Sequence, residues 1–206
     1  MTRLAVPGRT LLLVAGMPGA GKSTLLRGLP VRPGLRVLDS DRYRDLLSTA
    51  LRPMPYRWYR PLVHLWHRLA AVAAAASAAP TVVVHLPATG AGTRAVVARL
   101  ARLTGRTPHL LWLHVEPAEA LRGQRERGRV VPGASFAGHA ERAAAATARL
   151  RAAGTAPTWA TVTVLDREAA RTGLVLDTDP DPAAAPGRGP RPDAAAPVER
   201  APTRPQ

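Results

Sequence analysis

The stretch that decides the fold is residues 16–24, Gly16-Met17-Pro18-Gly19-Ala20-Gly21-Lys22-Ser23-Thr24. It fits the pattern G-x-x-x-x-G-K-[ST], and it lies between an apolar run that predicts a strand and a stretch that predicts a helix. An ordinary glycine turn is the alternative, but it does not explain why a strand, a glycine-rich loop, a lysine and a helix follow one another at the expected spacing. The stretch therefore predicts a phosphate-binding loop (P-loop).

Each residue type in this loop has a physical role. Glycines adopt positive φ and let backbone N–H groups approach phosphate oxygens, and the helix that follows points its positive end at the same anion. Lys22 is a compact cation that reaches the β- and γ-phosphates, and Ser23 offers a hydroxyl to Mg²⁺. The residues expected to hold the nucleotide are Gly16, Gly19, Ala20, Gly21, Lys22, Ser23 and Thr24.

Composition excludes several classes of protein. The chain has 206 residues, of which 46% are hydrophobic and 21% charged, so bulk disorder is excluded. It has no cysteine, which excludes a disulfide scaffold and a thiolate metal site. No apolar run approaches the roughly 18 to 20 residues of a membrane helix. The apolar run near the N-terminus is too short for a signal peptide and leads straight into the P-loop, so we expect a cytoplasmic protein.

The charge of the chain is strongly positive. Its net charge is +15, and all but one of its basic residues are arginines. A GC-rich genome that favours arginine and alanine explains most of this, and an anionic partner is the alternative. Against that background the single lysine, Lys22, marks a position that needs an ammonium rather than a guanidinium.

The chain divides into a domain over residues 1–177 and a tail over residues 178–206. The tail contains eight prolines and seven alanines and is predicted to be disordered. Strands are predicted at Thr10–Ala15, Arg36–Asp39, Thr81–His85, His109–Val115 and Thr161–Asp166. Helices are predicted at Lys22–Leu29, Tyr43–Ala50, Pro61–Ala79, Thr93–Leu103, Pro117–Arg127 and Ser135–Ala152, with a last one starting near Asp166. Their alternation predicts a three-layer α/β fold with a parallel five-stranded sheet.

Two carboxylates follow the second predicted strand. Strand ends on this edge of a doubly wound sheet face the ligand crevice, so both lie within reach of the P-loop. We expect Asp41 to accept a proton from a substrate hydroxyl and Asp39 to hold Mg²⁺ through water. The alternative is that these residues only cap the helix from Tyr43.

The P-loop ending in Gly-Lys-Ser-Thr, with Asp-x-Asp-Arg-Tyr-Arg on the next strand, resembles the small P-loop kinases of the polynucleotide kinase, zeta-toxin and chloramphenicol phosphotransferase types. From Leu11 to about Leu176 the chain is most similar to actinobacterial proteins described as AAA family ATPases, although it is too short for a complete ring-forming module. The resemblance implies that Asp41 is the general base and that Arg42 or Arg44 binds the substrate.

The third strand departs from the family pattern. The family ends this strand with an aspartate that supports Mg²⁺, and here His85 or Leu86 takes its place. A neutral imidazole is a poor ligand for Mg²⁺, which prefers oxygen. The supporting carboxylate must then come from elsewhere, with Asp39 as the best candidate. We expect His85 to be a buried core histidine and Thr89 to place a hydroxyl near the phosphates.

An arginine-rich segment over residues 121–132 resembles the family's lid. Its arginines are placed to clamp a transferring phosphoryl group, and Gly123, Gly128 and Gly133 are candidate hinges. The alternative is a solvated basic helix end whose cations complement the helix dipole. The arginines expected to stabilise the transferred charge are Arg125, Arg127 and Arg129.

Residues 52–68 interleave arginines and histidines with aromatic rings. Such a segment suits a nucleotide or single-stranded nucleic acid, a flat anionic metabolite, or an acidic membrane surface. The plainer alternative is a helix whose side chains at positions 58, 59, 62 and 66 pack on the core while its arginines face water. At the far end of the domain, Asp166 is expected to be a helix N-cap.

Together these patterns predict an enzyme that binds Mg-ATP and transfers the γ-phosphoryl group to a hydroxyl-bearing or anionic small molecule. A nucleotide-dependent switch without an acceptor is one alternative, and a nucleic-acid 5′-end kinase is another. No N-K-x-D run that would select guanine is present, which favours ATP.

Overall fold

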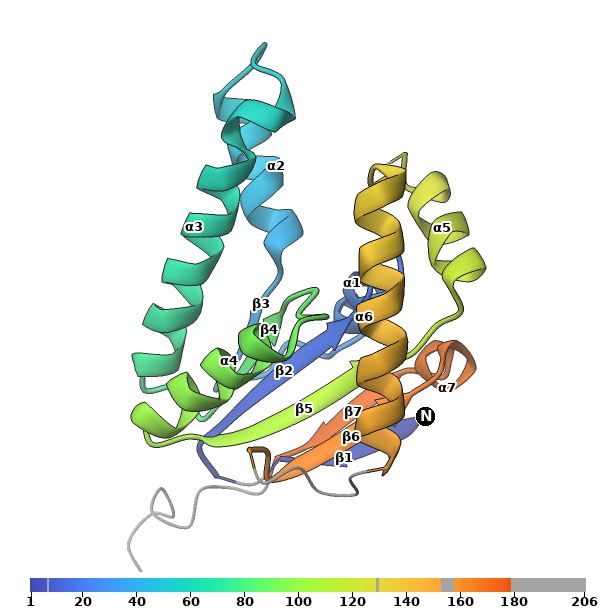
Figure 1. Cartoon of the computed structure of the whole chain (residues 1–206). Helices are drawn as coiled ribbons and strands as arrows, with labels where there is room; N and C mark the ends of the chain where they lie inside the picture. The colour runs from blue at the N-terminus through green and yellow to red at the C-terminus, as the bar shows by residue number, and fades with distance from the viewer. Residues whose placement is uncertain (7, 129, 153–157, 179–206) are drawn as a thin grey trace, which may run out of the picture.

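The computed structural model describes residues 1–6, 8–128, 130–152 and 158–178 of the chain. Its centre is a five-stranded parallel sheet in the order β3-β4-β2-β5-β6. The strands are β2 (Thr10–Gly16), β3 (Leu35–Leu38), β4 (Thr81–His85), β5 (Thr107–Leu113) and β6 (Thr161–Leu165). The predicted parallel five-stranded sheet is thereby confirmed, and the P-loop leaves the carboxyl end of its middle strand (Figure 1).

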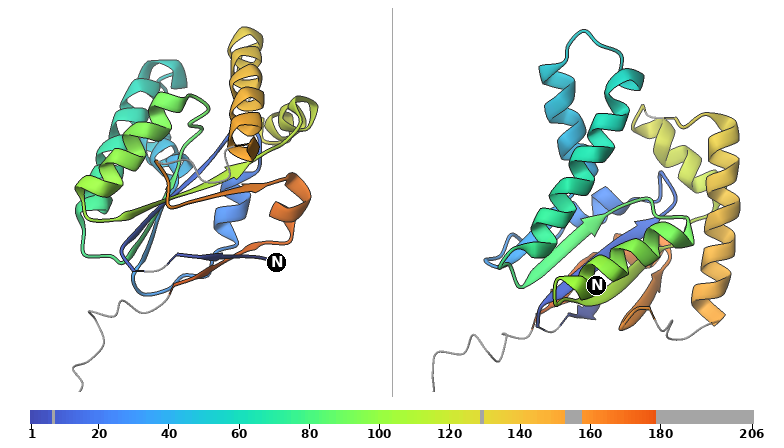
Figure 2. Two further views of the ribbon diagram at one scale, coloured as in Figure 1. Left: turned by 60° about the horizontal axis from the view of Figure 1, so that its bottom comes forward. Right: turned by 60° about the vertical axis from the view of Figure 1, so that its left-hand side comes forward.

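Seven helices connect these strands in the described part of the chain. They are α1 (Lys22–Arg27), α2 (Ser40–Ala50), α3 (Tyr56–Ala76), α4 (Ala91–Leu103), α5 (Pro117–Glu126), α6 (Gly133–Ala152) and α7 (Arg167–Arg171). Figure 2 shows α3, α4 and α6 on one face of the sheet and α1 on the other, which makes three layers. The α2–α3 pair and the α5–α6 pair both rise beyond the edge of the sheet where the P-loop lies (Figures 1 and 2).

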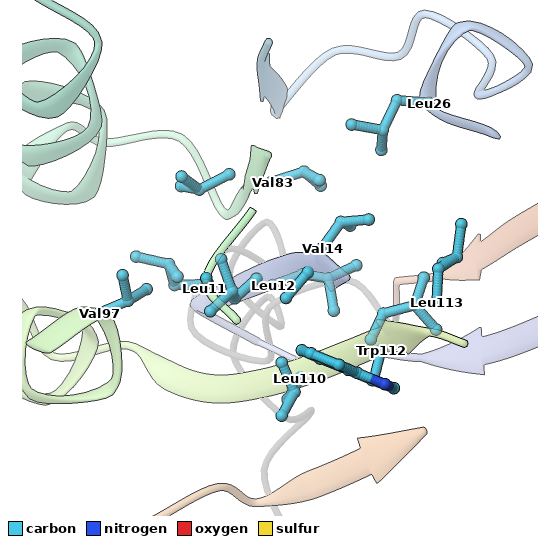
Figure 3. Packing of buried hydrophobic residues seen from close by; sticks show 14 of the residues in the cluster. Leu11, Leu12, Val14, Leu26, Val83, Val97, Leu110, Trp112 and Leu113 are labelled. Carbon is cyan, nitrogen blue, oxygen red and sulfur yellow. The ribbon is translucent and has the colours of Figure 1, made fainter. Parts of the chain in front are cut away.

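The core is formed by strands that are buried on both faces. Every residue of β2 and β4 is buried, as are six of the seven residues of β5. Leu11, Leu110 and Trp112 lie on one face of the sheet, and Leu12 and Val83 lie on the other (Figure 3). Alternate side chains of a strand point to opposite faces, so a strand that is covered on both faces must be apolar at nearly every residue. The sequences of these three strands show this pattern.

Two strands were not predicted. β1 (Thr2–Ala5) and β7 (Leu174–Asp177) pair in parallel to form a separate two-stranded sheet. Each has only four residues, too few for a periodic pattern, and their partners are more than 170 residues apart in sequence. Leu4, Leu174 and Leu176 nevertheless join the main core.

Two helix starts were predicted wrongly. α2 begins at Ser40 rather than Tyr43, because the Asp39 side chain caps its N-terminus. α3 begins at Tyr56 rather than Pro61, so that Pro61 lies inside the helix. The predicted tail lies outside the described residues except for Thr178. Within the part that the structure describes, no helix combines the length and apolarity needed to cross a bilayer.

Candidate functional site

The P-loop conformation depends on its glycines. Gly16, Gly19 and Gly21 have φ angles of 143°, 89° and 93°, which residues with a side chain rarely adopt. A Cβ on Gly16 would lie 2.5 Å from the Leu113 carbonyl oxygen. Gly21 is the N-cap of α1 and has no side chain to cap it. Alternation of such left-handed residues with right-handed ones is the conformation in which successive backbone N–H groups form an anion-binding concavity.

Lys22 lies under this loop. Its side chain is only 4% exposed, and Nζ donates to the carbonyl oxygens of Gly16 and Met17, both at 2.8 Å. Burial, followed by the nearby Arg127 guanidinium, lowers the pKa of Lys22 to about 7, against the opposing effect of two aspartates. The Lys22 amino group is thus desolvated and held by two backbone carbonyl oxygens of the loop.

Two carboxylates face the P-loop from the start of α2. Ser23 Oγ donates to Asp41 Oδ2 at 3.3 Å. Asp39 Oδ1 accepts from the Asp41 backbone N–H at 3.0 Å and lies 2.7 Å from Nδ1 of His85. Asp39 is therefore the helix cap, and Asp41 stands in the first turn with its carboxylate directed at the P-loop serine. The sequence-based prediction that both carboxylates lie next to the P-loop agrees with this geometry.

The His85 contact controls the charge of Asp39. Burial alone would raise the pKa of Asp39, but the hydrogen bond and charge of His85, with the Asp41 N–H and the Ser23 hydroxyl, lower it to about 2. An ionised carboxylate only accepts hydrogen bonds, so His85 Nδ1 is the donor. His85 is buried at the end of β4, as expected, and its partner is the carboxylate that follows the neighbouring strand β3.

Two adjoining cavities share this site. The smaller, of about 220 Å³, lies over the P-loop, and the larger, of about 900 Å³, opens toward α2. Their common walls are Ser23, Asp41 and Arg127. Arg44 lines the smaller cavity, while Asp39, Asp45 and Thr49 are among the residues that line the larger one. Asp41 thus lies in the wall that the two cavities share.

The predicted arginines differ in position. Arg127 follows the last residue of α5, and its Nη2 donates to Thr24 Oγ1 at 3.0 Å across the P-loop. Arg125 is exposed in the last turn of α5 and lines neither cavity. Arg129 lies outside the described residues, and so does the side chain of Arg42.

Gln124 is a site residue that the sequence did not reveal. It is buried, its Nε2 donates to the Pro18 carbonyl oxygen at 2.9 Å, and its Oε1 accepts from the Val131 N–H at 2.8 Å. A Cβ on the neighbouring Gly123 would lie 2.7 Å from the Gly19 carbonyl oxygen. Gly123, expected as a hinge, is therefore a close packing contact between α5 and the P-loop.

Thr89 was expected near the phosphates, and it lies buried beside α6. Its Oγ1 is 3.0 Å from Nδ1 of His139. Arg94 Nη1 donates to the carbonyl oxygens of Ala88 and Thr89, both at 2.8 Å, and its guanidinium lies over the Trp112 ring. These contacts fix the loop after β4, in which Ala88 has a φ of 40°.

Comparison with known sequence families agrees with this geometry. The family described as "AAA domain" matches residues 11–153, which span the P-loop, the two carboxylates and the α5–α6 pair. The chain belongs to this AAA domain family. No curated protein matches it.

Solved structures with the same fold include a protein of the PezAT chromosomal toxin–antitoxin system of Streptococcus pneumoniae. It has 13% identity and a TM-score of 0.54, over 78% of this chain and 68% of that one. A candidate kinase from Chloroflexus aurantiacus has 19% identity and a TM-score of 0.52, over 76% and 87%. At these identities the likeness shows the fold of the AAA domain and nothing finer.

Proposed function

We propose that this AAA domain transfers the γ-phosphoryl group of Mg-ATP to a hydroxyl group of a small acceptor. The observation that carries the proposal is the position of Asp41 in the wall shared by the two cavities. The P-loop side suits the nucleotide phosphates, and the larger cavity toward α2 gives an acceptor room to present its hydroxyl. Simple hydrolysis needs only a water molecule at that place.

In this proposal each residue has a defined part in the reaction. Lys22 exchanges its two P-loop carbonyls for phosphate oxygens, and the backbone of the loop binds the β-phosphate. Asp41 takes the proton of the acceptor hydroxyl while that oxygen bonds to the γ-phosphorus. The bond from the γ-phosphorus to the β–γ bridging oxygen breaks, and ADP leaves with the electron pair. Arg127 offsets the charge that is transferred.

The residues present fit a magnesium ion brought in with the nucleotide. The Ser23 hydroxyl and the Asp39 carboxylate are hard oxygen donors that lie close to each other beside the P-loop. In the described residues no group of three or more acidic, histidine or cysteine side chains could hold a metal without help. That suits Mg²⁺, which commonly uses one or two protein oxygens together with substrate phosphates and water. When bound, the ion would neutralise phosphate charge.

The walls of the larger cavity carry charges of both signs, from Arg27 and Arg127 and from Asp39, Asp41 and Asp45, which suits a polar acceptor that bears hydroxyl groups. Arg44 lines the smaller cavity and Arg27 the larger one, and Arg127 lines both. Arg42, Arg125 and Arg129 remain predicted contributors to substrate and charge binding.

A nucleotide-dependent switch is the second candidate, and the His85–Asp39 pair favours it. His85 stands where the resembled kinases carry a carboxylate, and it occupies Asp39 Oδ1 at 2.7 Å. If this pairing keeps Asp39 from supporting the metal, the domain would still bind ATP but would catalyse phosphoryl transfer poorly. The domain would then bind ATP tightly and hydrolyse it slowly.

Label transfer from γ-labelled Mg-ATP separates these candidates. Wild type, Lys22→Ala and Asp41→Asn are incubated with a small-molecule extract and, separately, with 5′-hydroxyl oligonucleotides. We expect a labelled small molecule with wild type only. Labelled oligonucleotide instead would identify a nucleic-acid kinase. Free phosphate alone, formed as fast by Asp41→Asn as by wild type, would overturn the assignment of Asp41 and favour the switch.

A further inference from the structure

One side of α3 exposes a continuous row of large apolar side chains. The exposed fraction of these side chains ranges from 44% for Leu62 to 68% for Trp58. We call this row the α3 stripe; it consists of Trp58, Leu62, Leu65, Trp66, Leu69 and Val72. The residues recur every three or four positions, so they lie along one side of the helix. The middle of the row forms a shallow apolar groove.

The α3 stripe takes no part in holding the domain together. The helix packs on α2, β3 and β4 through its opposite side, where Tyr59, Val63 and His67 are buried. Of the side chains at positions 58, 59, 62 and 66, which the plainer alternative placed on the core, only Tyr59 is buried. Figure 1 shows α3 at the outer edge of the molecule, with the α2–α3 pair rising past the sheet. Six large apolar groups on one exposed helix mark an interaction surface.

Along α3 and α4 the charge has one sign. From Leu46 to Val115 the sequence has eight arginines and no aspartate or glutamate. On α3 itself Arg57, Arg60 and Arg68 are all exposed. The adjacent helix α4 also lacks acidic residues, and it exposes further arginines together with apolar side chains. The exposed members on α4 are Val96, Arg99, Arg102 and Leu103. A partner must therefore combine an apolar layer with negative charge.

We propose that the α3 stripe docks on the surface of an anionic lipid bilayer. A helix that lies in a membrane interface carries Trp and Leu on one face and arginines beside them. Tryptophan rings favour the headgroup level, and arginines near the surface are attracted by anionic headgroups. A second copy of the chain explains the charge less well, because it would bring arginines against arginines. The proposal does not depend on the phosphotransfer activity.

Vesicle binding by the full chain tests the proposal. The probes are vesicles of phosphatidylcholine alone and of phosphatidylcholine with phosphatidylglycerol in equal amounts. We expect the protein to float with the mixed vesicles, weakly or not at all with the neutral ones, and less as salt is raised. Tryptophan emission supplies a local readout. Because Trp112 and Trp159 are buried, a blue shift on adding mixed vesicles reports Trp58 and Trp66.

Variants on and off the stripe show whether this surface is the one used. Leu65→Glu with Leu69→Glu should weaken binding to the mixed vesicles by about tenfold or more, since two apolar contacts become charged. Val31→Glu is the matched control, because Val31 is fully exposed in the loop before β3. It should bind as wild type does. Arg57→Gln with Arg68→Gln should reduce the preference for the anionic vesicles.

Three results would overturn the proposal. The first is absence of flotation with the mixed vesicles, which would leave an acidic protein as the partner to seek. The second is equal loss of binding in the stripe variant and in Val31→Glu. The third is a dimer in sedimentation velocity that the stripe variant dissociates, without vesicle binding by either form. All the substituted side chains are exposed, so we expect the variants to fold. Circular dichroism spectra that match the wild type would confirm this.

Discussion

At the scale of single residues, the lowered pKa of Lys22 predicts that nucleotide binding depends on pH. That pKa is lowered to about 7 by burial and by Arg127, so a large share of the free protein carries a neutral amine above neutral pH. Phosphates favour the ammonium form, so binding takes up a proton in that range. We expect nucleotide affinity to fall as pH rises past 7, approaching about tenfold per pH unit. Calorimetric titrations in buffers of different ionisation enthalpy measure both the affinity and the proton uptake.

Lys22→Arg is the control for this prediction. A guanidinium stays protonated throughout this range, so the pH dependence should flatten even if the affinity is lower. An affinity that stays level above neutral pH in the wild type would contradict the lowered pKa of Lys22.

Asp39 should stabilise the fold in a pH-dependent way. Its pKa falls from 3.8 to about 2 on folding, so its contribution is complete above pH 4 and is lost as pH falls through 2. This corresponds to about 2 kcal/mol of unfolding free energy at neutral pH. Asp39→Asn keeps a good N-cap but removes the charge beside His85, so it should lose that amount. Urea unfolding at neutral and at acidic pH measures the difference, which should shrink toward pH 2; a constant difference would rule out the charge effect.

The sequence predicted the local part of this site. The P-loop residues, Asp39 and Asp41 belong to contiguous motifs, so their positions beside one another follow from spacing along the chain. The His85–Asp39 contact depends on β3 lying beside β4, and Gln124 depends on how α5 returns to the P-loop. Both contacts join residues that are far apart in sequence, so no local pattern predicts them.

At the scale of elements, the close fit of α5 against the P-loop should be essential. A Cβ on Gly123 would lie 2.7 Å from a backbone oxygen of Gly19, which cannot move without shifting the loop. We expect Gly123→Ala to lower the unfolding free energy by about 1–3 kcal/mol and to weaken nucleotide binding. Urea denaturation and a fluorescence titration with nucleotide measure the two effects.

Gly92→Ala is the matched control within a helix. Gly92 lies in α4 and has no atom within 4 Å of an added Cβ, so alanine should be neutral or stabilising by about 0.5–1 kcal/mol. If both alanines had the same effect, helix propensity rather than packing would explain the result.

Elements were predicted well where burial is strongest. β2, β4 and β5 are nearly all apolar because both of their faces are covered, and they were found to within about two residues of their ends. β1 and β7 were missed because a four-residue strand is stabilised by its distant partner rather than by its own pattern. The start of α3 was misplaced because Pro61 favours the first turn of a helix, and here Pro55 occupies the N-cap.

At the scale of the whole molecule, the P-loop joins two helix pairs that stand apart. Gln124 and Arg127 connect it to α5, and the Ser23–Asp41 hydrogen bond connects it to α2. In Figure 2 the α2–α3 pair and the α5–α6 pair flank this edge of the sheet from opposite sides. A nucleotide on the loop would therefore contact both pairs at once, and its binding energy would stabilise the entire domain.

This coupling predicts a thermal shift that separates binding from chemistry. With Mg²⁺ and a non-hydrolysable ATP analogue at about 100 times its Kd, linkage adds about 2.7 kcal/mol of stability. For a domain of this size that corresponds to a Tm increase of about 5–10 °C. Lys22→Ala should abolish the increase because the phosphates lose their cation. Asp41→Asn should retain most of it, since the proposed base acts on the acceptor. Differential scanning fluorimetry measures all three proteins, and an equal increase in Lys22→Ala would place the nucleotide outside the P-loop.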